Sequence, residues 1–246
     1  MSNMRGGNKY SGYTIIEVLI VLAISSFMFV IASQFISGKA ADTSFRTGVN
    51  EMASRIQDAI DQVSNGQYTD KRVTCTVDQN SGTYTITEGG GGSQGSNEEC
   101  LFIGKIVEFT TDTKTYKVYT LAGRSYNAGN PATSYSLAEP QIVALFTVTK
   151  SMPQGLTPTS RYVFGVGQSL GSYSSGNFSS GSQSTKLIKP SNASLPPTPP
   201  TITGLDGVVT TFSMCITDGT RSGQISVGDN NSMSVSTKIF YNSSCA

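Results

Sequence analysis

An apolar run near the N-terminus is the most prominent feature of the hydrophobic pattern. Residues 13–36 are almost wholly apolar, and no charged residue occurs between Val18 and Gly38. As a helix this run would extend about 36 Å, compared with about 30 Å for the hydrocarbon core of a bilayer. No proline occurs before Pro131, so no sharp kink is expected. The pattern predicts a transmembrane helix over residues 13–36.

A second pattern follows the apolar run directly. After Lys39 the apolar residues thin to one stripe at intervals of three or four, which is the period of an amphipathic helix: Phe45, Val49, Met52, Ile56, Ile60 and Val63. Asn65-Gly66 supplies a stop signal, so we expect one long helix over residues 13–65. We expect the stripe to pack on the protein's own sheet rather than on a separate partner.

The rest of the chain, residues 66–246, has the pattern of a β-rich head. Short runs rich in Val, Ile, Thr, Tyr and Phe are separated by Gly, Asn, Asp and Ser, which is typical of antiparallel strands. The expected fold class is α+β, with one antiparallel sheet curled over the amphipathic half of the helix. Loops rich in Gly, Ser and Pro are expected over 165–201. The predicted strands are 72–77, 83–87, 100–109, 115–121, 141–149, 161–166, 208–216, 224–227 and 233–241.

Composition narrows the possible chemistry. Charged residues make up 13% of the chain, the formal net charge is +1, and there is no histidine. The absence of histidine excludes Ser-His-Asp and Cys-His nucleophiles and histidine-ligated zinc. Residues 167–171 match the GxSxG pattern of serine hydrolases, but they lie in a Gly/Ser tract and have no histidine to accept the serine proton. We expect no enzyme activity and no cofactor, although chemistry that uses only carboxylates or lysine stays open.

Four cysteines, Cys75, Cys100, Cys215 and Cys245, lie outside the apolar run. An even number of cysteines in an exported head favours two disulfides. Three pairings are possible, and we favour Cys75 with Cys100 and Cys215 with Cys245, because each pair brackets a loop region and the second would tie down the last strand. A metal site is not expected, because the sequence has neither a CxxC pair nor a histidine.

Three ordinary interpretations of the apolar run compete: a cleaved secretory signal, an uncleaved signal anchor and a buried core helix. The run is longer than the apolar part of a secretory signal, and a core helix is rarely apolar on every face over this length. An anchor fits the length, with Arg5 and Lys9 on the cytoplasmic side. An anchor does not explain Glu17, a carboxylate inside the run, where a charge is unfavourable.

The residues around Glu17 carry a specific resemblance. The class III prepilin signal of type IV pilins and type II secretion pseudopilins is similar to the run Ser11-Gly12-Tyr13-Thr14-Ile15-Ile16-Glu17-Val18-Leu19-Ile20-Val21-Leu22-Ala23-Ile24. The resemblance implies a leader peptide over residues 1–12, cleavage between Gly12 and Tyr13 by a prepilin peptidase, and N-methylation of Tyr13. It also implies that Glu17 acts in assembly, by neutralising the terminal amine of a neighbouring subunit.

The same resemblance implies a pilin-like fold, in which half of one long helix protrudes and half lies on the head. The implied function is that of a structural subunit of a type IV pilus-like filament. Major pilins often have proline where this chain has Gln34, which favours a minor pilin or a pseudopilin. The alternative is a membrane-tethered surface-binding or adhesion module that recognises a cell surface or DNA.

The expected partners and location follow from the resemblance. The partners are other pilin subunits, the prepilin peptidase, a pilus or type II secretion assembly platform, membrane lipid and a surface ligand of the head. The expected location is the bacterial cytoplasmic membrane, with the head outside the cytoplasm, and then an extracellular or periplasmic filament.

Overall fold

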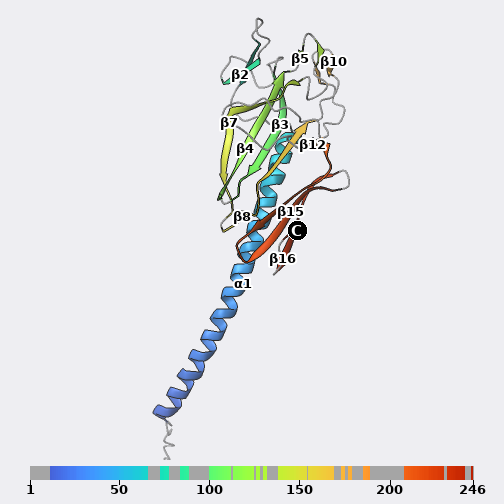
Figure 1. The fold of residues 1–246 in the computed structure, drawn as a ribbon. Coiled ribbons are helices and arrows are strands. Elements are labelled where there is room, and N and C mark those ends of the chain that lie inside the picture. The colour runs from blue at the N-terminus through green and yellow to red at the C-terminus, as the bar shows by residue number, and fades with distance from the viewer. Residues whose placement is uncertain are drawn as a thin grey trace, which may run out of the picture. The chain divides into compact units, whose positions relative to one another are not determined.

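In the computed structural model the chain forms two compact units, Met1–Ser44 and Phe45–Ala246. One helix, α1 (Ile15–Ser64), contributes to both units and is followed by antiparallel strands, so the protein has the α+β, pilin-like architecture expected (Figure 1). The structure describes residues 12–65, 73–77, 84–88, 100–111, 113–124, 126–127, 130–131, 138–153, 155–168, 173–174, 177–178, 185–188, 208–229, 232–241 and 245.

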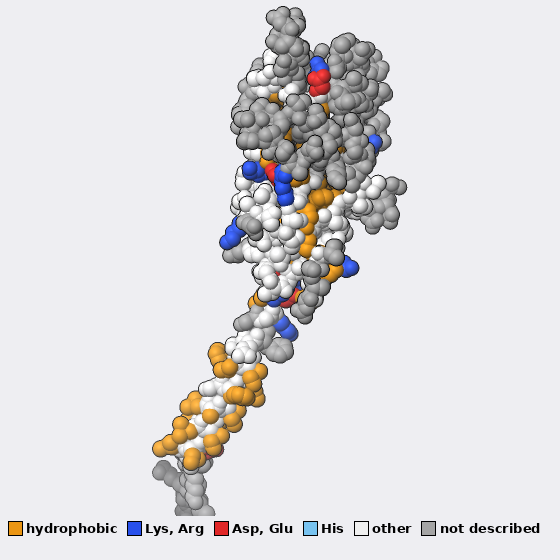
Figure 2. All heavy atoms as spheres, viewed as in Figure 1, with side chains coloured by type: hydrophobic (Ala, Val, Ile, Leu, Met, Phe, Trp, Pro, Cys, Tyr) orange, Lys and Arg blue, Asp and Glu red, His pale blue; other side chains and the backbone are white. Residues whose placement is uncertain are grey.

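In the first unit, α1 exposes its large apolar side chains. Their exposed fractions range from 46% at Val18 to 83% at Ile15. Hydrophobic side chains cover much of the visible face of this part of the helix (Figure 2). Because the run is apolar on every face, no single direction of packing is encoded in it.

In the second unit, the amphipathic part of α1 forms the centre of the core. All six residues of the predicted stripe, from Phe45 to Val63, are buried. They pack with apolar residues of β3 (Cys100–Phe109), β4 (Thr115–Arg124), β9 (Tyr162–Gln168) and β14 (Phe212–Thr217). The prediction that the stripe packs on the protein's own strands is therefore confirmed.

Six strands form the larger sheet, in the order β13-β12-β9-β3-β4-β7. Every neighbouring pair is antiparallel, for example Val107 of β3 opposite Val118 of β4. Successive side chains of a strand point to opposite faces. Accordingly, Val107 belongs to the core around α1, whereas Ile106 belongs to a second apolar cluster. The remaining bounds are β7 (Gln141–Ser151), β12 (Thr185–Ile188) and β13 (Val208–Val209).

Four strands form a second sheet, in the order β16-β15-β14-β8. Gly223 of β15 (Arg221–Asp229) lies directly beside α1, where an added Cβ would be 3.0 Å from Val49 Cγ2. Glycine therefore allows the close approach of this strand to the helix. The other strands are β8 (Thr157–Pro158), β16 (Ser232–Tyr241) and the hairpin strands β1 (Val73–Val77), β2 (Tyr84–Glu88), β5 (Tyr126–Asn127), β6 (Asn130–Pro131), β10 (Tyr173–Ser174) and β11 (Asn177–Phe178).

Two sequence-based expectations need correction. The single sheet is replaced by two principal sheets, because the strand predicted over 208–216 is divided: Val208 and Val209 pair with β12 in the larger sheet, and Phe212–Thr217 pairs with β15 in the other. The range predicted to be loop, 165–201, contains the end of β9, the short strands β10 and β11 and the whole of β12. Leu187 pairs with Val166 and both are buried, so packing overrides the Gly/Ser-rich composition of the surrounding chain.

Candidate functional site

The candidate processing site is a short non-helical segment that precedes α1. Gly12, Tyr13 and Thr14 have no regular secondary structure and are exposed, and the helix begins at Ile15. The peptide bond between Gly12 and Tyr13 therefore lies outside the helical hydrogen-bond pattern. A bond in exposed, irregular backbone is the kind that can enter a protease active site.

Thr14 caps the helix, which explains why α1 begins after Tyr13. Its carbonyl accepts hydrogen bonds from the backbone N–H of Glu17 (3.0 Å) and Val18 (3.2 Å), and its Oγ1 accepts from the N–H of Glu17 at 3.3 Å. Thr14 and Glu17 have the Thr-x-x-Glu spacing of a capping box. The Thr-x-x-Glu spacing is a local sequence signal for a helix that begins at Ile15 rather than at the predicted Tyr13.

Glu17 lies in the first turn of α1 and is exposed. The free N–H groups at a helix N-terminus favour a negative charge there, so this position tolerates the carboxylate better than the middle of the apolar run would. Glu17 is three residues from Thr14 and four from Tyr13, about one turn of helix. The structure thus places the carboxylate near the candidate cleavage point and in open space.

Polar side chains farther along the apolar run are satisfied by the helix itself. Ser26 Oγ donates to the Leu22 carbonyl at 2.8 Å, and Ser33 Oγ donates to the Val30 carbonyl at 2.8 Å. Such bonds remove the cost of placing a hydroxyl in lipid. Helix α1 is long and apolar enough to cross a membrane by length and composition.

The predicted cysteine sites are only partly covered by the described residues. Cys215 of β14 and Cys245 form a disulfide, the pairing favoured from the sequence. The backbone of Cys75 lies in β1 opposite Ile86, and the backbone of Cys100 begins β3 opposite Arg124. The side chains of Cys75 and Cys100 lie outside the described residues, so their pairing stays a prediction.

Comparison with known proteins agrees with this geometry. Residues 7–33 match the family described as the prokaryotic N-terminal methylation motif. This motif is the class III prepilin signal of type IV pilins and pseudopilins, and the chain carries it. No curated protein and no solved structure matches the chain.

The match supports a general class of protein. The motif is that of pilin- or pseudopilin-like processed subunits, and together with the apolar N-terminal helix it indicates anchoring in a membrane and display in a filament or on a surface. The motif points to a structural subunit that works with other pilin subunits and a prepilin peptidase. The matched segment contains Gly12, Tyr13 and Glu17 and ends before the β-rich head.

Proposed function

We propose that this chain is a structural subunit of a type IV pilus-like filament, specifically a minor pilin or a pseudopilin, and that it assembles by packing of helix α1. The observation that carries this proposal is the exposed apolar surface of α1 in the first unit. Such a surface requires a cover. Membrane lipid supplies the cover before assembly, and the helices of other subunits supply it in the filament.

In this proposal a prepilin peptidase removes residues 1–12 and leaves Tyr13 as the new, methylated N-terminus. The exposed, non-helical backbone at Gly12 and Tyr13 supports it. Arg5 and Lys9 give the leader a positive charge, which favours the cytoplasmic side of the membrane. The head is then outside the cytoplasm, in an oxidising compartment, and the Cys215–Cys245 disulfide fits that location.

Glu17 is the assembly residue in this proposal. Its carboxylate is exposed at the start of α1, so the terminal amine of a neighbouring subunit could reach it. In an apolar interior, a carboxylate and an ammonium group attract each other strongly. Removing either one leaves an unpaired buried charge, which is strongly unfavourable. The pair would therefore select one axial position of the incoming helix.

A minor pilin or pseudopilin fits better than a major pilin because α1 is uninterrupted. Gln34 lies within the continuous helix Ile15–Ser64, and no proline is present to break the backbone hydrogen-bond pattern. We therefore expect the apolar half to stay helical in the filament. The assembly platform, of a pilus or of a type II secretion system, would be identified by co-purification with the membrane-inserted chain.

Processing is tested by expressing the full chain with and without a prepilin peptidase and measuring the intact mass. We expect a chain that begins at methylated Tyr13 only when the peptidase is present. Gly12→Glu should block cleavage, whereas Gly38→Ala, a control glycine substitution inside α1, should not. A chain that still begins at Met1 beside an active peptidase would contradict the proposal.

Assembly is tested with Glu17→Ala, and Gln34→Ala is the matched control because it also removes a polar side chain from the apolar half. Glu17→Ala should insert into the membrane and be cleaved but be absent from sheared filaments. Gln34→Ala should enter filaments normally. If Glu17→Ala also enters filaments normally, the carboxylate has no assembly role. A chain that keeps its leader and never enters a filament would instead support the membrane-tethered binding module.

A further inference from the structure

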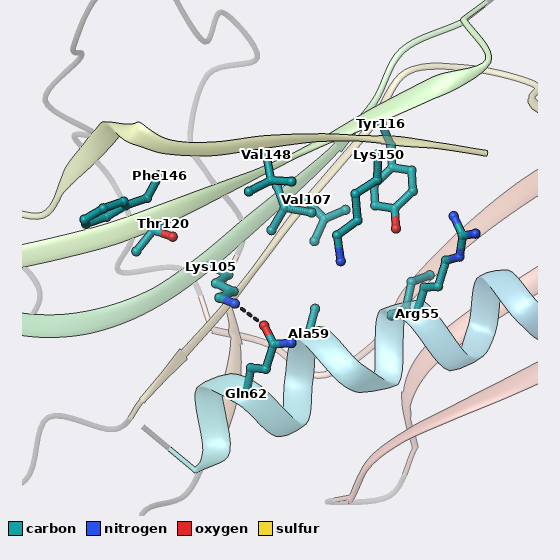
Figure 3. Close-up of a pocket in the computed structure, with 12 residues that line it drawn as sticks. Arg55, Ala59, Gln62, Lys105, Val107, Tyr116, Thr120, Phe146, Val148 and Lys150 are labelled. Carbon is teal, nitrogen blue, oxygen red and sulfur yellow. Dashed lines mark hydrogen bonds between the residues drawn. The ribbon is translucent and has the colours of Figure 1, made fainter. Parts of the chain in front are cut away.

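Helix α1 and the larger sheet enclose a cavity of about 140 Å³ in the second unit. Its walls are mainly apolar, with Ile56 and Ala59 from the helix and Val107, Val118 and Phe146 from β3, β4 and β7 (Figure 3). For comparison, an apolar cavity of about 150 Å³ in another protein binds benzene. The space is therefore sufficient for a compact organic molecule.

Positive groups gather at this cavity. Arg55, Lys105 and Lys150 line it, and none of the described residues that line it is acidic. Arg55 is already paired with Glu51 on the same helix face. Lys105 is 8% exposed, and in the described part of the chain its ammonium donates to Gln62 Oε1 (Figure 3). The two lysines thus give the cavity a positive charge that its own walls do not balance.

The electrostatic surroundings of Lys105 agree with this imbalance. Burial lowers the pKa of the Lys105 ammonium, and the charge of Lys150 lowers it further. An anion beside the two ammonium groups would oppose both causes and raise the pKa of Lys105, because it would supply an opposite charge and hydrogen-bond acceptors.

A third polar group at the cavity is the Tyr116 hydroxyl. It is buried and has no acceptor for its proton among the described residues, because Arg55, the charged group of α1 that interacts with it, can only donate hydrogen bonds (Figure 3). A buried hydroxyl without a partner is unfavourable, so such a group in a cavity wall indicates an absent acceptor. The Tyr116 ring is held in place by stacking on Phe109, with 5.3 Å between ring centroids.

We propose that this cavity binds a carboxylate attached to a compact apolar body. The carboxylate would accept hydrogen bonds from Lys105, Lys150 and Tyr116, and the apolar body would contact Val107, Val118 and Phe146. The apolar walls favour such a molecule over inorganic phosphate, which would have to give up its hydration without apolar contacts in return. The carboxylate could belong to a free organic acid or to an acidic side chain of a protein partner.

The test uses the folded full chain in detergent, titrated with benzoate and followed by calorimetry. Benzamide is the neutral probe of the same shape, and inorganic phosphate is the anion without an apolar body. We expect saturable binding of benzoate and at least tenfold weaker binding of both other probes. Equal affinity for benzamide, tighter binding of phosphate or no saturable binding of benzoate would each overturn the proposal.

Variants locate the binding within the cavity. Lys105→Met should weaken benzoate binding about tenfold or more, and Lys150→Met about threefold, because Lys150 is more exposed. Tyr116→Phe keeps the stacked ring and should weaken binding about threefold. The control is Lys117→Met, an exposed lysine on β4 outside the cavity. If Tyr116→Phe and Lys150→Met fold normally but bind benzoate as Lys117→Met does, the cavity is not the site.

A capped peptide with one glutamate distinguishes the two sources of the carboxylate. Binding of this peptide in competition with benzoate would assign the cavity to an acidic side chain of a partner. Binding of benzoate alone would assign it to a free organic acid. Both outcomes support a carboxylate site, and neither depends on cleavage at Gly12 or on filament assembly.

Discussion

The two parts of helix α1 are similar in backbone structure and different in environment. Ile24 in the first unit is 57% exposed, whereas Ile56 in the second is 1% exposed, although both lie in the same continuous helix. The first part is apolar on all faces, and the second has a single apolar stripe. Helix formation is therefore common to both parts, and the arrangement of apolar residues decides which medium each part requires.

Polar groups in the two parts of α1 differ in the same way. Ser26 and Ser33 bond to backbone carbonyls of their own helix. In the second part, pairs within the helix such as Arg55 with Glu51 are joined by partners from distant strands: Gln168 Nε2 donates to the Val63 carbonyl at 2.7 Å, and Arg46 donates to the Tyr241 hydroxyl. Gln168 thereby satisfies one of the carbonyls left free at the end of the helix. These serines of the first part therefore find their hydrogen-bond partners within the helix, whereas polar groups of the second part also need partners from the head.

The largest expected difference in stability is between two variants that each truncate one isoleucine, Ile56 in the second part of α1 and Ile24 in the first. Ile56→Ala leaves a cavity in the core and should lower the free energy of unfolding of the head by about 2–5 kcal/mol. Ile24→Ala removes the same atoms from an exposed position and should change it by less than about 0.5 kcal/mol. Urea unfolding of the full chain in detergent, followed by near-UV circular dichroism of tyrosine, measures both. Equal losses would remove the distinction between the two parts.

The disulfide should stabilise the head without affecting the apolar part of α1. Cys215 and Cys245 are 30 residues apart. Replacing both with serine should lower the free energy of unfolding of the head by about 3 kcal/mol, because the unfolded chain regains the entropy of an open loop. Urea unfolding measures the loss, and reductant should lower the stability of the parent chain by at least as much, because it would also break the predicted Cys75–Cys100 disulfide. Membrane insertion, followed by carbonate extraction, should not change; an unchanged urea midpoint would contradict the prediction.

The next effect comes from an ion pair between a buried carboxylate, Glu108 of β3, and an exposed arginine, Arg161, that directly precedes β9. The Glu108 carboxylate accepts from Arg161 Nε (3.0 Å) and Nη2 (2.7 Å) and from the Tyr119 hydroxyl (2.6 Å). Burial and this carboxylate together raise the pKa of Tyr119. Glu108→Gln should lower the free energy of unfolding by about 1–3 kcal/mol, because Arg161 loses its charged acceptor.

The matched control for this ion pair is Glu51→Gln. Glu51 pairs with Arg55 one turn along α1 in an exposed position, so its removal should cost less than about 0.5 kcal/mol in urea unfolding. If the two variants lose equal stability, burial does not strengthen the Glu108 pair.

The smallest expected effect is a change in how the stability of the head depends on acid pH, caused by Asp218 in the turn before β15. Burial acts to raise the pKa of Asp218, but hydrogen bonds from the Thr220 and Arg221 backbone N–H groups outweigh it, so the pKa is lowered from 3.8. Because the pKa of Asp218 is lower in the folded than in the unfolded chain, its ionised carboxylate stabilises the fold above pH 3.8. This stabilisation is lost as the pH falls through the folded-state pKa. Asp218→Asn should cost about 1 kcal/mol or less at neutral pH and flatten the acid side of the stability profile. An unchanged profile would contradict this.

Local patterns predicted much of the fold. The stripe from Phe45 to Val63 and the strand over 100–109 agree with the structure, because each depends on the period of consecutive side chains. The division of 208–216 between two sheets and the strand β12 were missed. Phe212–Thr217 forms a hairpin with the next strand, β15, but Val208 and Val209 pair with β12, and β12 pairs with β9. The pairings of β12 join segments that are not adjacent in the sequence, so no local pattern indicates them.

The sequence by itself determined the N-terminal region. Its apolar run, its methylation motif and the cap at Thr14 are contained in consecutive residues, because a membrane, a processing enzyme and a helix turn each interact with a short continuous segment. Only the tertiary structure decided the cavity and the ion pair of Glu108. Lys105 and Lys150, or Glu108 and Arg161, come together only after antiparallel strands pair in one register, which depends on packing across the whole head.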